Sequence, residues 1–183
     1  MVPRDLVTRN CLVATELAVY LAVMDLTGFY EREIMVHDED VIFNMTGEIR
    51  ATSAQRKMVN EAIASLIRKK ALSGQKVGQG RYLVQCKEMG EVKYGYVMID
   101  YGKIRTLIRG CADGREWQGL LLYYFELMCH MDKEGTCRYS LQYFSDHTGI
   151  SELTLSKYNS KLTDLGLIKI QHHSKSTNSY LTL

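Results

Sequence analysis

The sequence has a single proline, Pro3, among 183 residues, and no long low-complexity run. Disordered chains and proline-rich linkers have the opposite composition, so we expect an ordered protein. Hydrophobic residues make up 46% of the chain and charged residues 24%, which is ordinary for a globular domain. A chain of this length forms either one large domain or two small ones.

Cysteines are too few and too irregular for a disulfide framework or a zinc motif. Their number is odd and no Cys-x-x-Cys occurs. The apolar run from Leu12 to Met24 contains Glu16 and has no basic start, so it is not a secretory leader. These features predict reduced thiols in a cytoplasmic protein. The five cysteines are Cys11, Cys86, Cys111, Cys129 and Cys137.

Long hydrophobic runs are also missing. The apolar stretch from Trp117 to Met131 contains Glu126 and falls short of the roughly 20 residues that a membrane-spanning helix needs. We therefore expect no membrane partner.

Motifs for catalysis and cofactor binding do not stand out either. Gly78-Gln79-Gly80 precedes an expected strand, whereas a dinucleotide loop precedes a helix. His172 and His173 are adjacent, but no second pair of ligands follows at a helical or hairpin spacing. The sequence therefore predicts no enzyme, no cofactor and no metal site.

Net charge is small, +2, but charge is distributed unevenly. Residues 1–49 hold three basic and nine acidic side chains, whereas residues 50–81 hold eight basic side chains and one acidic side chain. Such a basic block predicts a basic face, the electrostatic footprint of a polyanion site. A solvated helix face is the alternative explanation.

The last third of the chain has the order of a winged helix-turn-helix. Ser140 and Ser151 are suited to cap two helices that meet at Thr148-Gly149-Ile150-Ser151. Gly166 is suited to end the second helix, and a hairpin of residues 167–171 and 178–183 follows. In this order the second helix can enter a DNA major groove.

A weaker copy of this pattern lies about 96 residues earlier. Helices are expected near residues 15–26, 38–47 and 53–70, followed by a hairpin with a glycine tip. Val59, Leu66 and Leu72 correspond to positions 155, 162 and 168, which lie 96 residues later and are also apolar. Two unrelated helical domains that share a period by chance are the alternative.

The fold class predicted is therefore mainly α with small β-hairpins (α+β), in two tandem winged helix-turn-helix units. Their bounds are 1–90 and 91–183, and the pair could form an internal pseudo-dimer. A strand is expected over 92–99, and Asp100 is expected to cap a short helix that follows. Asp38 is expected to cap the helix near 38–47, and a short strand is expected at 138–140.

Polar residues on the two second helices and the hairpin tips are the candidate DNA contacts. Arg56 suits guanine, because its guanidinium matches O6 and N7, and Gln55 or Asn60 suits adenine. Any surface helix can carry such residues, so they indicate DNA contacts only because they lie on helices of an expected helix-turn-helix. The candidates are Ser53, Gln55, Arg56, Lys57, Asn60, Lys76, Gln79, Arg81, Ser151, Thr154, Lys157, Ser160, Lys161, His173 and Lys175.

A resemblance to known proteins supports this interpretation. Tyr139-Ser140-Leu141, Thr148-Gly149-Ile150-Ser151, residues 162–168 and Asn178-Ser179-Tyr180 resemble the winged helix-turn-helix of plasmid and phage replication initiators and related regulators of Gram-positive bacteria. The tandem arrangement resembles small DNA-binding accessory proteins of conjugative plasmids from those bacteria. One departure is Lys70-Ala71-Leu72, which stands where Leu-Gly-Leu-Ile is expected.

The resemblance implies sequence-specific binding of double-stranded DNA, without catalysis, in the regulation of plasmid transfer or maintenance. Two other functions stay open: replication initiation, and a winged-helix protein–protein adaptor. We expect a monomer that contains the internal pseudo-dimer, with a homodimer as the alternative.

Overall fold

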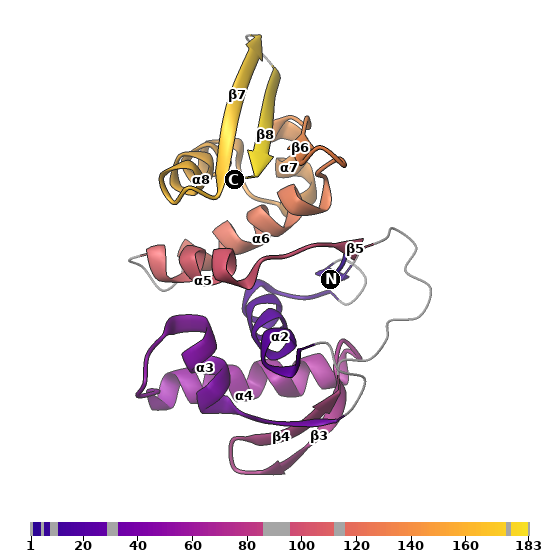
Figure 1. Cartoon of the computed structure of the whole chain (residues 1–183), viewed down its shortest axis with the longest axis vertical. Coiled ribbons are helices and arrows are strands. Elements are labelled where there is room, and N and C mark those ends of the chain that lie inside the picture. The colour runs from indigo at the N-terminus through magenta and orange to yellow at the C-terminus, as the bar shows by residue number, and fades with distance from the viewer. Residues whose placement is uncertain are drawn as a thin grey trace. The chain divides into compact units, whose positions relative to one another are not determined.

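The computed structural model describes residues 2–4, 6–7, 11–28, 33–85, 96–111, 116–174 and 177–182. They form an α+β structure with two small three-stranded antiparallel sheets, which confirms the predicted class (Figure 1). The chain divides into two compact units, Met1–Tyr96 and Val97–Leu183. None of the described helices combines the length and the apolar character that crossing a bilayer requires.

Unit 1, Met1–Tyr96, begins with the short strand β1 (Val2–Pro3) and the helix α2 (Ala14–Thr27). Strand β2 (Ile34–His37) leads directly into α3 (Asp38–Thr46), and α4 (Ser53–Arg68) follows. The hairpin of β3 (Ser73–Gly78) and β4 (Arg81–Gln85) completes the sheet, whose strand order is β2-β4-β3.

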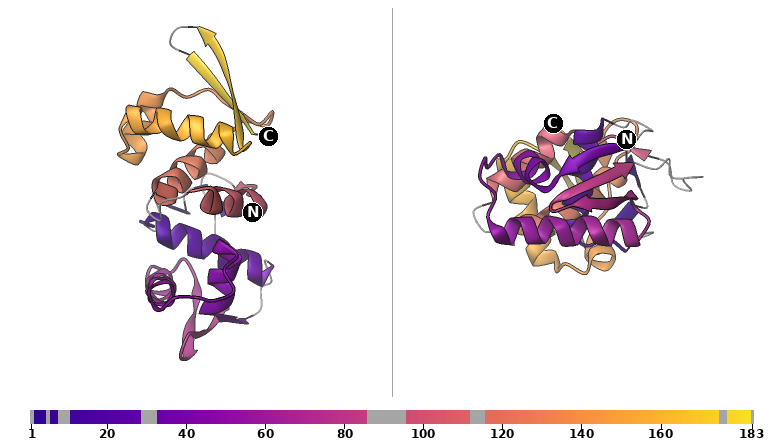
Figure 2. Two further views of the ribbon diagram at one scale, coloured as in Figure 1. Left: turned by 90° about the vertical axis from the view of Figure 1, so that its left-hand side faces the viewer. Right: turned by 90° about the horizontal axis from the view of Figure 1, so that it is seen from below.

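Unit 2, Val97–Leu183, repeats this succession after the short strand β5 (Tyr96–Val97). Helices α5 (Tyr101–Gly110) and α6 (Glu116–Cys129) precede strand β6 (Thr136–Cys137). Helices α7 (Leu141–Thr148) and α8 (Glu152–Asp164) and the hairpin of β7 (Ile168–Ser174) and β8 (Thr177–Thr182) follow. The sheet order is β6-β8-β7, and the hairpin extends away from the helices of its unit (Figure 2).

Equivalent apolar positions fill the two cores. Val59, Leu66 and Leu72 of unit 1 are at most 2% exposed, and so are their counterparts 96 residues later. Large buried side chains complete each core, such as Ile63 in unit 1 and Phe144 in unit 2. The apolar spacing thus identified the inward faces of α4 and α8.

The expected helix caps are confirmed. Ser140 and Ser151 cap α7 and α8 through their hydroxyls. The sequence makes Thr52 and Ser53 both suited to cap α4, and it is Thr52 whose Oγ1 accepts a hydrogen bond from Gln55 N, at 3.2 Å. Gly149 ends α7 with a φ of 70°. Asp100 caps α5 through Oδ1, which accepts from Gly102 N at 2.8 Å.

Two local expectations are wrong. The N-cap position of α3 is His37, and Asp38 is the first helical residue. The reason is that Asp38 N donates to Gly80 O at 2.8 Å, so the helix begins directly at the end of the strand pairing. Likewise the strand expected at 138–140 lies earlier, at Thr136–Cys137, because Asp132 N donates to Thr136 O at 2.9 Å and closes the turn there. Of the strand expected at 92–99, residues 92–95 lie outside the described part.

Candidate nucleic-acid interface

A polar pocket of about 410 Å³ lies where α4 meets the turn between β3 and β4. Four of the predicted contacts line it: Arg56 and Asn60 from the helix, and Lys76 and Gln79 from the hairpin. Residues from the helix and the hairpin that are about 20 positions apart in sequence therefore converge on one place. Asp38 and Gly80 complete the lining.

Arg56 is exposed, yet its guanidinium forms an ion pair with Glu39. Both side chains are about half exposed, at 46% and 57%, so the pair contributes little to stability, about 0–1 kcal/mol. The acidic first turn of α3 therefore contacts the basic helix α4. Acidic and basic side chains that lie in separate segments of the sequence thus pair with each other in the fold.

Asn60 lies at the centre of a hydrogen-bonded network. Its Nδ2 donates to Asp38 Oδ2 at 2.7 Å and to Arg56 O at 2.6 Å. Its Oδ1 accepts from the Tyr82 hydroxyl at 2.6 Å. Burial and then the charge of Asp38 raise the pKa of Tyr82, which keeps this hydroxyl a donor. The Asn60 amide thus connects α4 to α3 and β4 through hydrogen bonds. We therefore assign Asn60 the role of holding these three elements in position.

Gly80 lets the hairpin turn approach this network closely. Its φ is 63°, a conformation that residues with a Cβ rarely adopt. A Cβ at this position would lie 2.7 Å from Asp38 Cγ. Glycine is therefore required where the hairpin closes on Asp38.

The other predicted contacts of unit 1 differ in how available they are. Gln55 Oε1 accepts from Thr52 N at 2.8 Å, so this amide completes the helix cap. Lys57 is exposed, with its Nζ 4.0 Å from Glu61. Lys76 Nζ lies 6.0 Å from the centre of the Tyr82 ring. The remaining predicted contacts of the unit, Ser53, Gln79 and Arg81, are exposed.

Side chains on the outer face of α8 make fewer contacts with the rest of the protein than those on the outer face of α4. Ser151, Lys157 and Ser160 are exposed, and Thr154 and Lys161 are half-buried. The Lys157 side chain forms no hydrogen bond or ion pair with any residue that the structure describes. The structure does not describe the His173 side chain or Lys175.

A buried tyrosine of α6 and a half-buried histidine directly after this helix hold α8 and α7 in place. The Tyr123 hydroxyl donates to Asn159 Oδ1 at 2.7 Å, and burial raises the pKa of Tyr123. His130 Nδ1 donates to Glu126 O at 2.8 Å, so its Nε2 can accept from the Tyr143 hydroxyl, 2.7 Å away. These contacts fix the helix that carries Lys157 without using Lys157 itself.

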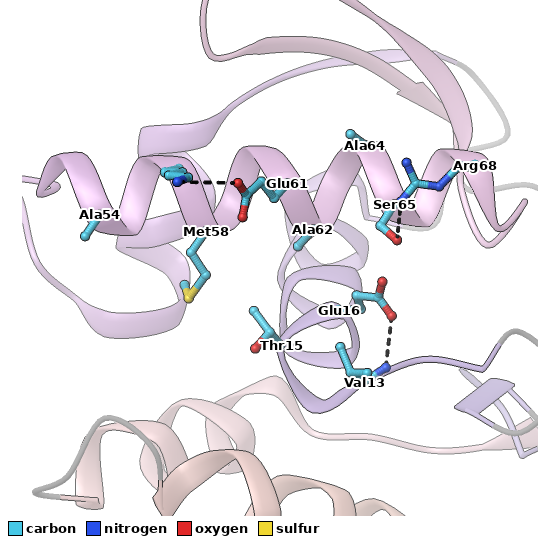
Figure 3. A pocket seen from close by; sticks show the side chains of 11 residues that line it. Val13, Thr15, Glu16, Ala54, Met58, Glu61, Ala62, Ala64, Ser65 and Arg68 are labelled. Carbon is cyan, nitrogen blue, oxygen red and sulfur yellow. Dashed lines mark hydrogen bonds and ion pairs between the residues drawn. The ribbon is translucent and has the colours of Figure 1, made fainter.

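A second hollow, of about 700 Å³, lies between the start of α2 and α4 (Figure 3). Small and apolar side chains such as Ala54 and Met58 line much of it. Of the predicted contacts, Lys57 alone belongs to the lining. Glu16 also lines the hollow. Its carboxylate accepts hydrogen bonds from Val13 N at 2.9 Å and from Lys69 Nζ at 2.6 Å, so Glu16 has a structural role.

Sequence reasoning missed Asp38 and Glu39 as members of the candidate interface. Asp38 is 6% exposed and lies 22 residues before its partner Asn60, and no local pattern connects the two. The described residues contain no group of three or more His, Cys, Asp or Glu side chains placed to hold a metal ion.

Comparisons with models of protein families, with curated proteins and with solved structures found no match to this chain. The geometry of α4, α8 and their hairpins is therefore the basis for assigning a function.

Proposed function

We propose that this chain binds double-stranded DNA sequence-specifically through two winged helix-turn-helix units. One observation carries the proposal: both units have the order helix, strand, helix, helix and hairpin, and in both sheets the last strand lies between the other two. In helix-turn-helix proteins, the second of the paired helices enters the major groove. That helix is α4 in unit 1 and α8 in unit 2.

The charges of these elements support the proposal. Residues 50–81, which include α4 and the β3–β4 turn, carry eight basic side chains and one acidic side chain. Arg56 and Lys76 line the pocket beside the hairpin, where a backbone phosphate would meet two cations. On α8, the exposed Lys157 is available for a phosphate.

The biological role that we propose follows from the resemblance of residues 92–183 to regulators and accessory proteins of Gram-positive plasmids. The protein would occupy a site near an origin or a promoter, and binding alone would be its mechanism. The exposed faces of α4 and α8 differ, with Gln55, Arg56 and Lys57 on one and Thr154 and Lys157 on the other. One chain would therefore cover an asymmetric site, and light scattering without DNA should give a mass near 21.0 kDa.

Retention of random-sequence duplex DNA over rising salt concentration tests the proposal. Each phosphate that the protein neutralises should add about 0.9 to the slope of log affinity against log salt. A steep decline in affinity is the expected result. Absence of binding at low salt, or binding that salt does not weaken, would contradict DNA binding and favour the adaptor function.

A further inference from the structure

The first turn of α8 presents an apolar side chain to solvent. Leu153 is 72% exposed, whereas the core positions of the same helix, Leu155 and Leu162, are fully buried. The helix therefore packs against its unit without Leu153. Water contact with most of a leucine side chain forgoes the favourable free energy that its burial would give.

We propose that Leu153 is a specificity-determining residue that contacts the C5-methyl group of a thymine in the major groove. The inference rests on the proposed DNA-binding function. The N-terminal residues of a recognition helix are those that reach base edges, and Leu153 is the second residue of α8. Thymine alone among the four DNA bases presents a methyl group there, and apolar side chains contact it.

The polar side chains around Leu153 are less suited to this task. The hydroxyl oxygens of Ser151 and Thr154 lie 2.9 Å apart, and Ser151 Oγ also accepts from Thr154 N at 3.3 Å. Both hydroxyls thus belong to the helix cap. Glu152 is exposed and anionic, so it repels phosphate and can only accept hydrogen bonds from a base. Leu153 is left as the apolar group on this turn that can pack against a base.

The test begins with the full chain and duplexes that it selects from a randomised DNA library. Each thymine of a selected duplex is then replaced, one at a time, by uracil, which lacks only the C5-methyl group. Wild-type protein should lose affinity about four-fold at one or two positions, the cost of one buried methyl contact. The Leu153→Ala variant should bind thymine and uracil duplexes equally at those positions.

Three controls make the outcome specific. Leu153→Met keeps an apolar side chain and should retain the preference for thymine. Leu26→Ala makes the same substitution at a 41% exposed position of α2 and should leave the uracil scan unchanged. Thermal unfolding should show that Leu153→Ala is as stable as the wild type, because exposed substitutions usually change stability by less than about 0.5 kcal/mol.

The inference is overturned if uracil lowers the affinity of the wild type and of Leu153→Ala equally at every position. It is also overturned if Leu153→Ala binds the selected duplex with unchanged affinity, as a leucine reserved for a protein partner would. In both cases the wild type still binds DNA, so the proposed function stands. Failure of the wild type to retain any duplex at low salt overturns the function and this inference together.

Discussion

Lys70 has the same left-handed backbone conformation in unit 1 that Gly166 has in unit 2, with φ angles of 60° and 67°. Both helices end in the same hydrogen bonds. Ala71 N donates to Leu66 O at 2.9 Å, and 96 residues later Leu167 N donates to Leu162 O at 2.9 Å. The departure of Lys70-Ala71-Leu72 from the expected sequence therefore leaves the geometry of the helix end unchanged.

Replacing Lys70 with glycine should stabilise the protein by about 1 kcal/mol. A left-handed conformation costs a residue with a Cβ roughly 1–2 kcal/mol, and the greater freedom of glycine in the unfolded chain offsets part of the gain. Urea unfolding measures the change. Lys70→Ala, which removes the charge but keeps the Cβ, should show no such gain. A Lys70→Gly variant less stable than the wild type would contradict this account of the helix end.

Stability should fall in acid partly because of Glu16. Burial raises the pKa of this carboxyl, but hydrogen bonds from Lys69, Ser65 and the backbone of Val13 outweigh it and leave the pKa below its ordinary value. The stabilisation is therefore present above the unfolded-state pKa, about 4.3, and is lost as pH falls through the lower folded-state pKa.

Glu16→Gln should cost about 2 kcal/mol near neutral pH, because it removes hydrogen bonds to a charged group. Its stability should then depend less on pH in the acid range. Urea unfolding between about pH 3 and about pH 7 measures both effects. Glu61→Gln, at a side chain that is 68% exposed, serves as the control. Equal pH profiles for Glu16→Gln and the wild type would show that the ion pair with Lys69 is not formed in solution.

Asn60 and Arg56 should respond differently to truncation, although both line the pocket. Asn60→Ala removes the side-chain partner of the buried Asp38 carboxylate and leaves the Tyr82 hydroxyl only a longer hydrogen bond, 3.4 Å, to the main-chain oxygen of residue 60. Stability should therefore fall by about 2 kcal/mol. Arg56→Ala should leave the melting temperature unchanged and weaken binding to selected DNA by about 1–3 kcal/mol. An unchanged melting temperature for Asn60→Ala would contradict the positioning role.

Local sequence features predicted much of the fold. Thr52, Ser140 and Ser151 cap helices because their hydroxyls are satisfied by backbone groups three residues away. Contacts between distant segments could not be predicted in this way. Asn60 is of a residue type that can hydrogen-bond a base. In the fold, however, its amide is hydrogen-bonded to Asp38, 22 residues earlier, and to Tyr82, 22 residues later.

The same limit applies to charge. Sequence blocks indicated a basic segment, whereas the fold brings Glu39 of the acidic block to Arg56 of the basic block. Net charge along the chain carries no information on such pairs, because they depend on how α3 packs against α4.

Glu39→Gln should strengthen DNA binding, because it frees Arg56 from a competing carboxylate. The expected gain is up to about five-fold, the strength of an exposed ion pair. Asp40→Asn is a matched control, since it makes the same change of charge at the next, exposed residue of α3. Titration of selected DNA at one salt concentration measures both variants. Equal gains for the two would indicate only a change in net charge and would contradict a DNA contact by Arg56.

The most direct measurement compares the salt dependence of DNA binding by Lys157→Ala and Lys133→Ala. Both lysines are exposed, but Lys157 lies on α8 and Lys133 in the turn between α6 and β6. If α8 enters the major groove, Lys157→Ala should lower the slope of log affinity against log salt by about 1, and Lys133→Ala should match the wild type. Equal slopes for all three proteins, or an equal loss in both variants, would contradict recognition of DNA through α8.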